Sequence, residues 1–359
     1  MIADRIARAL ADVPPVPPGA DGVLAATPDT VSWGWLPSGA DRPVLTVAPG
    51  AEVRVDTISH EGVLEDQGRD PVAFFGGLGV PDGAVLADAQ ALAASGMPHD
   101  PRTDGPHVVT GPIAIEGARP GDVVSITVRE LVPRVPYGIV SSRHGLGALP
   151  GEVIGDDAVF SAFCLVEDGR GSTARRAGAP DDRVRFPLAP FLGVMGVAAP
   201  ERRHSVAPGP HGGNVDVPLL GVGATLHLPV LVPGAGVYVG DPHFAQGNGE
   251  VALTAFEAPL RATLRLDLTP GDEFGPRESP LAGPLAETPE LWIPIGLDRD
   301  LDEAMRVCVR HSIDLLTGRY GMDRRHAYAY LSAAADYAVS QVVDDVKGVH
   351  GTIRKADLR

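Results

Sequence analysis

The 359-residue chain is 44% hydrophobic and carries a formal net charge of −16. This negative field would repel nucleic acid and anionic membranes, so we expect neither as a partner. With 44 Gly and 35 Pro residues but only 5% aromatic residues, the chain favours many short strands and tight turns over long helices.

Lysine and cysteine usage narrows the chemistry further. Lysine occurs only at Lys347 and Lys355, so a catalytic lysine would have to come from the C-terminal end. The spacing of Cys164 and Cys308 indicates neither a disulfide framework nor a thiolate metal site. No segment has the apolar core of a signal peptide or the length to cross a bilayer, and we therefore expect a cytoplasmic protein.

The pattern along the chain predicts four segments. Residues 1–30 hold a short amphipathic helix and a proline-rich linker, and residues 31–200 form a β-rich N-terminal domain. Residues 201–290 form a second β-rich domain, and residues 291–359 form a C-terminal α+β part. Within this last part we expect helices over 300–317 and 324–343, followed by one short closing strand.

Pro-Gly pairs recur between the apolar runs, at positions 49–50, 120–121, 233–234 and 270–271. They predict a repeated hairpin or sandwich unit, and residues 108–131 look like one such hairpin. The strand after the first pair leads to Asp56 and His60, and the strand after the third leads to Asp241 and His243. This parallel suggests two half-sites that face each other.

The stretch 205–257 concentrates polar side chains in two glycine-rich turns, HGGNVD and GDPHFAQGNGE. Turns of this kind can aim several side chains at one point while the flanking strands hold it still. The residues concerned are His211, Asn214, Asp216, Asp241, His243, Gln246 and Glu250.

Asp241 and His243 follow a predicted strand and stand two residues apart, so on extended backbone they would point the same way. Together they could hold one cation or one water molecule. Oxygen and nitrogen ligands suit zinc, and a carboxylate-rich version would also suit calcium or manganese. The alternative is a turn aspartate that caps its own backbone beside a half-buried histidine.

Several motifs resemble the acetamidase/formamidase family in their order and spacing. They are TGPIAIEGARPGDVV, GVMGVA, SVAPGPHGGNVD, GDPHFAQGNGEV, TAFEAPLRATL and the closing run AYLSAAADYAVSQVVDDVKGV, and the similarity extends from about residue 45 to residue 349. The chain departs from the family at Asn248, where relatives commonly have Asp.

The resemblance implies a mainly β fold with a β-sandwich or jelly-roll-like core, a smaller α+β part and the two C-terminal helices. It also implies hydrolysis of short linear carboxamides, of the acetamide or formamide type, to ammonia and a carboxylate. A divalent metal and assembly into homo-oligomers are further implications.

On this hypothesis a metal-activated water attacks the amide. We assign the proton transfers to Glu250, as general base or shuttle, and the oxyanion contact to Asn214, Gln246 or a backbone N–H of a glycine turn. Zinc is the first choice of metal, with calcium or manganese as alternatives, and the ligands we predict are Asp56, His107, Asp216, Asp241 and His243.

Other mechanisms fit the sequence less well. Cysteine and Ser-Ser-Lys amidases both need a lysine, and both lysines of the chain lie near its C-terminus. There is also no Gly-x-Ser-x-Gly elbow. The remaining alternatives are a hydrolase of a different C–N bond and a non-catalytic β-sandwich binding protein that a metal stabilises. Asn248 favours the binding protein, whereas Glu250 beside Asp241 and His243 favours the enzyme.

Overall fold

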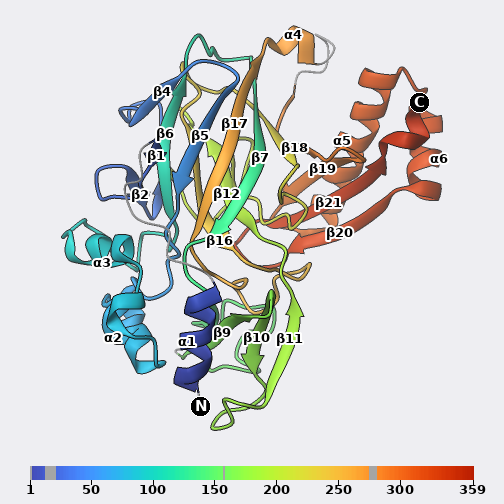
Figure 1. Cartoon of the computed structure of the whole chain (residues 1–359). Coiled ribbons are helices and arrows are strands. Elements are labelled where there is room, and N and C mark those ends of the chain that lie inside the picture. Colours follow the sequence, from blue (N-terminus) through green and yellow to red (C-terminus); the bar gives the residue numbers. More distant parts are fainter. Residues whose placement is uncertain (1, 13–21, 157, 275–280) are drawn as a thin grey trace.

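The computed structural model describes residues 2–12, 22–156, 158–274 and 281–359. Strands dominate it, which confirms the mainly β prediction (Figure 1). The largest sheet has nine strands, and most of its neighbouring strands are distant from each other in sequence. Their order is β1 (Val23–Leu24), β5 (Ala51–Asp56), β17 (Leu260–Thr269), β7 (Val123–Pro133), β15 (Thr225–Pro229), β18 (Leu285–Glu287), β19 (Leu291–Asp298), β21 (Lys347–Arg354) and β20 (Asp336–Gln341).

A six-stranded sheet faces the large one, and the main hydrophobic core lies between them. Val55, Ile126 and Leu264 of the large sheet and Met195 and Val239 of the smaller one belong to this core, and each is almost fully buried. The burial of one face of each sheet makes the pair a β-sandwich. The smaller sheet runs β14 (Gly212–Asn214), β12 (Phe191–Val197), β16 (Val237–His243), β6 (Val108–Ile115) and β2 (Val31–Trp33), with β4 (Leu45–Val47) parallel to β6.

Three Pro-Gly pairs carry the chain from one sheet of the sandwich to the other. The pairs at 49–50, 120–121 and 233–234 connect β4 to β5, β6 to β7 and β15 to β16. Gly50, Gly121 and Gly234 have φ angles of 84°, 97° and 80°, which glycine adopts at little cost. The hairpin predicted over 108–131 is therefore wrong, because β6 and β7 lie in different sheets. The sandwich interpretation of these pairs is confirmed.

A four-stranded sheet lies below the sandwich in the view of Figure 1. Its order is β11 (Arg183–Pro187), β10 (Arg170–Ala174), β9 (Val159–Glu167) and β8 (Tyr137–Arg143). The predicted N-terminal helix is present as α1 (Ile2–Asp12), and its buried Ile6 packs with Tyr137 and Leu165 of this sheet. The linker predicted after it falls mostly on residues 13–21, outside the described ranges.

Shorter elements complete the N-terminal half. Phe75 of helix α2 joins the cluster around Tyr137, and Leu92 of helix α3 packs against Trp33 at the edge of the sandwich. The elements are α2 (Pro71–Gly77), α3 (Ala87–Ala94), the 3-10 turns Glu65–Gln67 and Asp82–Ala84, and the two-stranded pair β3 (Trp35–Leu36) and β13 (Arg203–His204).

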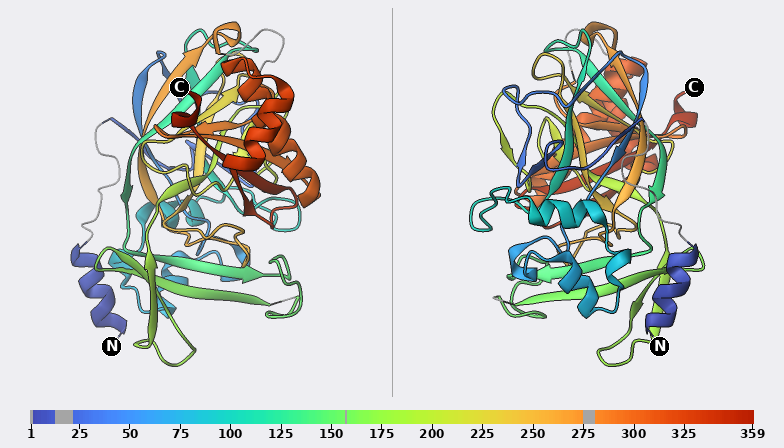
Figure 2. Two further views of the ribbon diagram at one scale, coloured as in Figure 1. Left: turned by 90° about the vertical axis from the view of Figure 1, so that its right-hand side faces the viewer. Right: turned by 60° about the vertical axis from the view of Figure 1, so that its left-hand side comes forward.

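The C-terminal part packs two helices, α5 (Leu301–Tyr320) and α6 (Arg324–Ala334), on one end of the nine-stranded sheet (Figure 2). The helix expected over 324–343 is too long. Ala335 leaves helical geometry, and the alternating sequence that follows forms β20, which pairs with β21. The short helix α4 (Gly271–Phe274) and the final 3-10 turn Lys355–Leu358 complete the described elements.

The four predicted segments remain a prediction. Hydrogen bonds join all four, because the nine-stranded sheet takes strands from 1–30, 31–200, 201–290 and 291–359. No described helix is both long and apolar enough to span a membrane.

Asp56 ends β5 in a buried ion network instead of a metal site. Its two carboxylate oxygens accept hydrogen bonds from Arg261 at 2.6 and 2.8 Å. Arg134 lies 3.2 Å from Asp56 and 2.8 Å from Asp88, and its side chain is fully buried. The carboxylates of Asp56 and Asp88 together thus balance the charges of Arg134 and Arg261.

We expect Asp56→Ala to lower the free energy of unfolding by about 3–5 kcal/mol, because it leaves buried cationic charge without its partner. Urea unfolding followed by circular dichroism measures this loss. Glu52→Ala is the matched control on the same strand, since its pair with Arg129 is exposed and is worth less than about 1 kcal/mol. Equal losses for the two variants would contradict the structural role of Asp56.

Candidate metal centre and active site

The motif Gly-Asp-Pro-His closes strand β16 at the centre of the six-stranded sheet. Asp241 and His243 are buried, and His243 Nε2 lies 3.0 Å from Asp241 Oδ2. The two side chains meet as predicted, but the reason is different. Asp241 has a φ of 49°, so a local departure from extended backbone, and not simple alternation, turns its carboxylate toward His243.

Gly193 of β12 stands opposite Asp241, since the register pairs Leu192 with Pro242 and Val194 with Gly240. A Cβ atom at position 193 would lie 2.5 Å from Asp216 Oδ1, 2.6 Å from Asp241 Oδ2 and 2.7 Å from His243 Cε1. The missing side chain leaves the space in which these three groups converge. The carbonyl of Gly193 also accepts the backbone N–H of Val215, which anchors the HGGNVD turn.

Buried ligand-type side chains form three overlapping groups among the described residues, and within each group the potential ligand atoms lie within 4.8 Å of one another. Asp241 is shared by two groups, and His243 is shared by two. The groups are His60, His107 and Asp241; Asp241, His243 and Glu257; and Asp216, His243 and Glu250.

The second of these groups has the spacing of ligands on one ion. His243 Nε2 lies 3.0 Å from both Asp241 Oδ2 and Glu257 Oε1, yet the nitrogen has no hydrogen-bond partner. Donor atoms about 2.1 Å from a common metal are separated by distances of this order. Buried polar atoms without partners are rare, and here they also include Asp241 Oδ1, both oxygens of Asp216, Glu250 Oε2 and Glu257 Oε2. The residues therefore fit a bound divalent cation.

The electrostatics of the group also favour bound cations. Burial raises the pKa of Glu250 well above its usual range, and the neighbouring Asp216 carboxylate adds to the rise. Burial likewise raises the pKa of Asp216 and brings that of Asp344 to about 7. For Asp241 burial opposes ionisation, but the His243 and His107 imidazoles hold its pKa well below the usual range.

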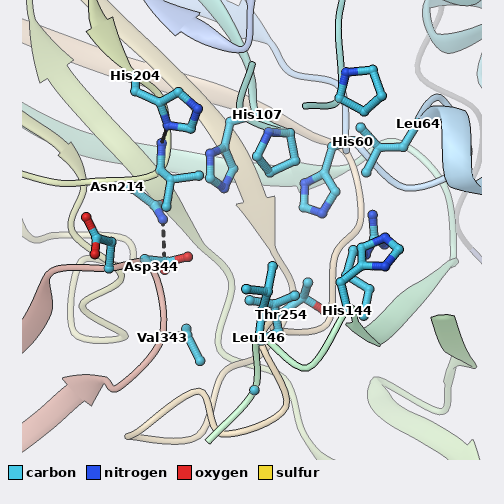
Figure 3. Close-up of a pocket in the computed structure, with 18 of the residues that line it drawn as sticks. His60, Leu64, His107, His144, Leu146, His204, Asn214, Thr254, Val343 and Asp344 are labelled. Carbon is cyan, nitrogen blue, oxygen red and sulfur yellow. Dashed lines mark hydrogen bonds between the residues drawn. The ribbon is translucent and has the colours of Figure 1, made fainter. Parts of the chain in front are cut away.

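A cavity of about 960 Å³ opens onto these side chains (Figure 3). His60, His107 and Asn214 line it, as do Glu250 and Glu257. Its outer walls come from the segments 99–107, 143–150 and 342–347, which are distant from one another in sequence. The cavity thus has a polar inner end, formed by the buried histidines and carboxylates, and outer walls that include apolar side chains.

The structure brings together most of the predicted site residues. His107, Asp216, Asp241, His243 and Glu250 all belong to the three groups, whereas Asp56 belongs to none of them.

Gln246 and Asn214 play different parts in the site. Both N–H donors of Gln246 bind backbone carbonyls, of Asp216 and Ser340, so its Oε1 faces His243 Nδ1 at 3.1 Å. Gln246 therefore orients His243 and is not free to hold an oxyanion. Asn214 lines the cavity and donates one N–H to Asp344 at 3.0 Å.

Sequence reasoning missed Glu257 and Asp344 as members of the site. Glu257 lies in the TAFE segment and reaches His243 through an isolated bridge between the two backbones. Asp344 comes from the segment after β20. His60 appeared only in the half-site comparison, where its place after a strand that ends in Asp was the available signal. Asn248 is exposed and belongs neither to the three groups nor to the cavity wall.

Comparison with known proteins agrees with this fold. The sequence model of the Acetamidase/Formamidase family matches residues 198–353. A putative formamidase of Schizosaccharomyces pombe is 28% identical over 203 residues, which cover 41% of this chain and 48% of the relative. An acetamidase of Mycolicibacterium smegmatis is 26% identical over 241 residues, which cover 50% of this chain and 58% of the relative. The chain thus matches about half the length of these curated relatives.

Solved structures match over a longer stretch. The acetamidase of Bacillus halodurans has a TM-score of 0.71 and 25% identity, covering 92% of this chain and 96% of that one. The acetamidase of Yersinia enterocolitica has a TM-score of 0.72 and 25% identity, covering 92% and 90%. Fold and site define a β-sandwich protein with a buried centre of histidines and carboxylates. Within that class, the chain is similar to the acetamidase/formamidase family, whose sequence model matches its C-terminal part.

We expect Gly193→Ala to lower the affinity for a divalent cation by at least about 10-fold, a loss typical of disturbed ligand orientation, because its Cβ would displace Asp216, Asp241 and His243. Zinc content after dialysis, measured by mass spectrometry, tests this. Gly247→Ala is the control in the neighbouring turn, since a Cβ there has no atom within 4 Å. A folded Gly193→Ala protein with wild-type zinc content would contradict the packing argument.

Proposed function

We propose that this protein is an amidase that hydrolyses linear carboxamides to ammonia and a carboxylate. The observation that carries the proposal is the buried group of Asp241, His243 and Glu257 at the floor of a large cavity, with Glu250 beside it. The names of the relatives support the same reaction class, since they include a formamidase and acetamidases.

Zinc is the divalent metal that this donor set suits best, because imidazole nitrogen joins carboxylate oxygen in the same group. Calcium prefers an all-oxygen shell and so fits less well, while manganese remains an alternative. Asp241, His243 and Glu257 would hold the ion. When bound, such an ion lowers the pKa of a water molecule to about 7 and polarises a carbonyl group.

Glu250 would move the protons. Hydrolysis forms a C–O bond and breaks the C–N bond, so one proton must leave the attacking water and the leaving nitrogen must gain one. Burial and the Asp216 carboxylate raise the pKa of Glu250 above its usual range, which suits a group that must take up a proton and then release it. The side-chain amide of Asn214 has two N–H groups, and one of them donates to Asp344. The other can donate to the oxygen of the substrate carbonyl.

The cavity suggests acyl groups longer than that of acetamide. Its volume of about 960 Å³ lies in the range of pockets that enclose drug-sized ligands. Leu64, Leu146, Leu253 and Val343 line it and could contact an aliphatic chain. Formamide or acetamide would leave most of this space to water.

Assembly into homo-oligomers and a cytoplasmic location are further parts of the proposal. Leu146, Leu149 and Val251 support assembly, since their exposures are 58%, 55% and 64%. Ala148 donates its backbone N–H to the Val251 carbonyl, so these side chains share one region beside the cavity. An apolar region of this kind is commonly covered by another subunit.

The alternative is a non-catalytic binding protein that a metal stabilises. The position of Asn248 weakens the main argument for it. Because that side chain is exposed and outside the three groups, the exchange of the family's usual Asp removes no ligand and no acid-base group. The other alternative, a hydrolase of a different C–N bond, would use the same site residues.

The function is tested by ammonia release from formamide, acetamide, propionamide, butyramide and hexanamide. We expect zinc-loaded protein to release ammonia, with kcat/KM rising from acetamide to the longer amides. Activity should fall at least 10-fold after chelation and return with zinc. Absence of ammonia from every amide with zinc or manganese would refute the amidase proposal.

We expect Glu250→Gln to lower kcat by about 10²- to 10⁴-fold, the range for loss of a positioned acid or base. Its zinc content should stay at the wild-type value. Asn248→Asp, in the same turn, serves as the control and should change kcat by less than about twofold, because its side chain is exposed. If Glu250→Gln retained the wild-type kcat, another group would have to carry the proton transfers.

A further inference from the structure

We propose that the centre holds two divalent cations, with the second bound by His60 and His107 and linked to the first through the carboxylate of Asp241. This inference rests on the metal part of the proposed function and leaves the identity of the substrate open.

The arrangement of the ligand atoms separates two positions. His60 and His107 form one group with Asp241, and His243 and Glu257 form another with the same aspartate. The donors on one zinc ion, at 2.0–2.2 Å from it, are at most about 4.4 Å apart. Asp241 is the one residue that both groups contain. A single ion therefore cannot bind the two histidines of the first group together with His243 and Glu257 of the second.

The carboxylate of Asp241 lies between the two groups. Its Oδ1 is 3.5 Å from His60 Nδ1, and its Oδ2 is 3.0 Å from His243 Nε2. Neither Asp241 Oδ1 nor His60 Nδ1 has a hydrogen-bond partner among the described residues, although both atoms are buried. Because imidazole nitrogens of both groups lie within 3.8 Å of this carboxylate, it can serve as a ligand shared by two ions.

Outer partners hold His60 in the orientation that a ligand requires. Its other ring nitrogen, Nε2, lies 3.4 Å from Glu61 Oε1. That oxygen also accepts hydrogen bonds from Ser141 Oγ at 2.5 Å and from Arg143 Nη2 at 2.6 Å, so the Glu61 carboxylate is fixed. A carboxylate behind a histidine directs the opposite ring nitrogen toward a metal.

His107 repeats this pattern with a hydroxyl group. Its Nδ1 lies 3.1 Å from the buried Ser205 Oγ, and its Nε2 is 3.8 Å from Asp241 Oδ2. The rings of His60 and His107 are perpendicular, with centroids 5.6 Å apart. Figure 3 shows the two rings side by side along one wall of the cavity, so an ion between them and Asp241 would border the substrate space.

Buried carboxylates surround both groups and favour bound cations. Asp216, Asp241, Glu250 and Glu257 are each at most 7% exposed. Buried charge without compensation is strongly unfavourable.

Metal stoichiometry tests the proposal independently of catalysis. Metal-free protein is titrated with zinc and dialysed, and zinc per chain is measured by mass spectrometry. We expect two equivalents for wild type and one for His60→Ala or His107→Ala. His144→Ala should keep two, because His144 lines the cavity with a side chain that is 46% exposed and joins none of the groups.

Two further measurements test the proposal even if His60→Ala or His107→Ala folds poorly. Glu61→Gln keeps the size of the side chain and should weaken only the second equivalent, by about 10- to 100-fold. Wild-type protein loaded with manganese should give the broadened electron paramagnetic resonance spectrum of two coupled ions. One equivalent in wild type, an isolated six-line manganese spectrum at saturation, or two equivalents in folded His60→Ala would each overturn the proposal. Ammonia release does not enter these outcomes, so a failed amidase assay would refute the proposed function alone.

Discussion

The buried carboxylate of Asp241 is the group on which the rest of the site depends. Three imidazoles approach it, with His243, His60 and His107 at 3.0, 3.5 and 3.8 Å. Each of these rings has a protein partner at its other nitrogen, from Gln246, Glu61 or Ser205. Such a shell holds its donors in place before any ion arrives, and pre-organisation of this kind improves both binding and catalysis.

The sandwich supplies the rigidity that this arrangement needs. Strand β16 lies between β12 and β6, so Asp241 and His243 are held from both sides. Asp216, Asp241, Glu250 and Asp344 all have positive φ angles, between 45° and 55°. Non-glycine residues in this region cost about 1–3 kcal/mol each, and they persist where surrounding structure fixes them. Their concentration at one cavity indicates that the fold stabilises a strained but convergent set of carboxylates.

The sequence predicted the local features well and the long-range ones poorly. Strand-rich composition and two glycine-rich turns were sufficient to locate Asp241, His243 and Glu250, because their signals are contiguous. Asp56 was misassigned because a strand that ends in Asp gives no indication of Arg261, 205 residues away, which pairs with it. Glu257 and Asp344 lack a motif of their own, and only the folded topology brings them to the site. The Pro-Gly pairs were recognised as reversals, but the sequence could not show that they cross between sheets.

The central claim is that a divalent cation binds at Asp241 together with His243 and Glu257. Diffraction from crystals of zinc-loaded protein, recorded on both sides of the zinc absorption edge, tests it most directly. The account predicts an anomalous peak about 2.0–2.2 Å from Asp241 Oδ2, His243 Nε2 and Glu257 Oε1, the distances zinc makes to such ligands. Crystals with zinc bound elsewhere, or with no peak among these three side chains, would contradict it.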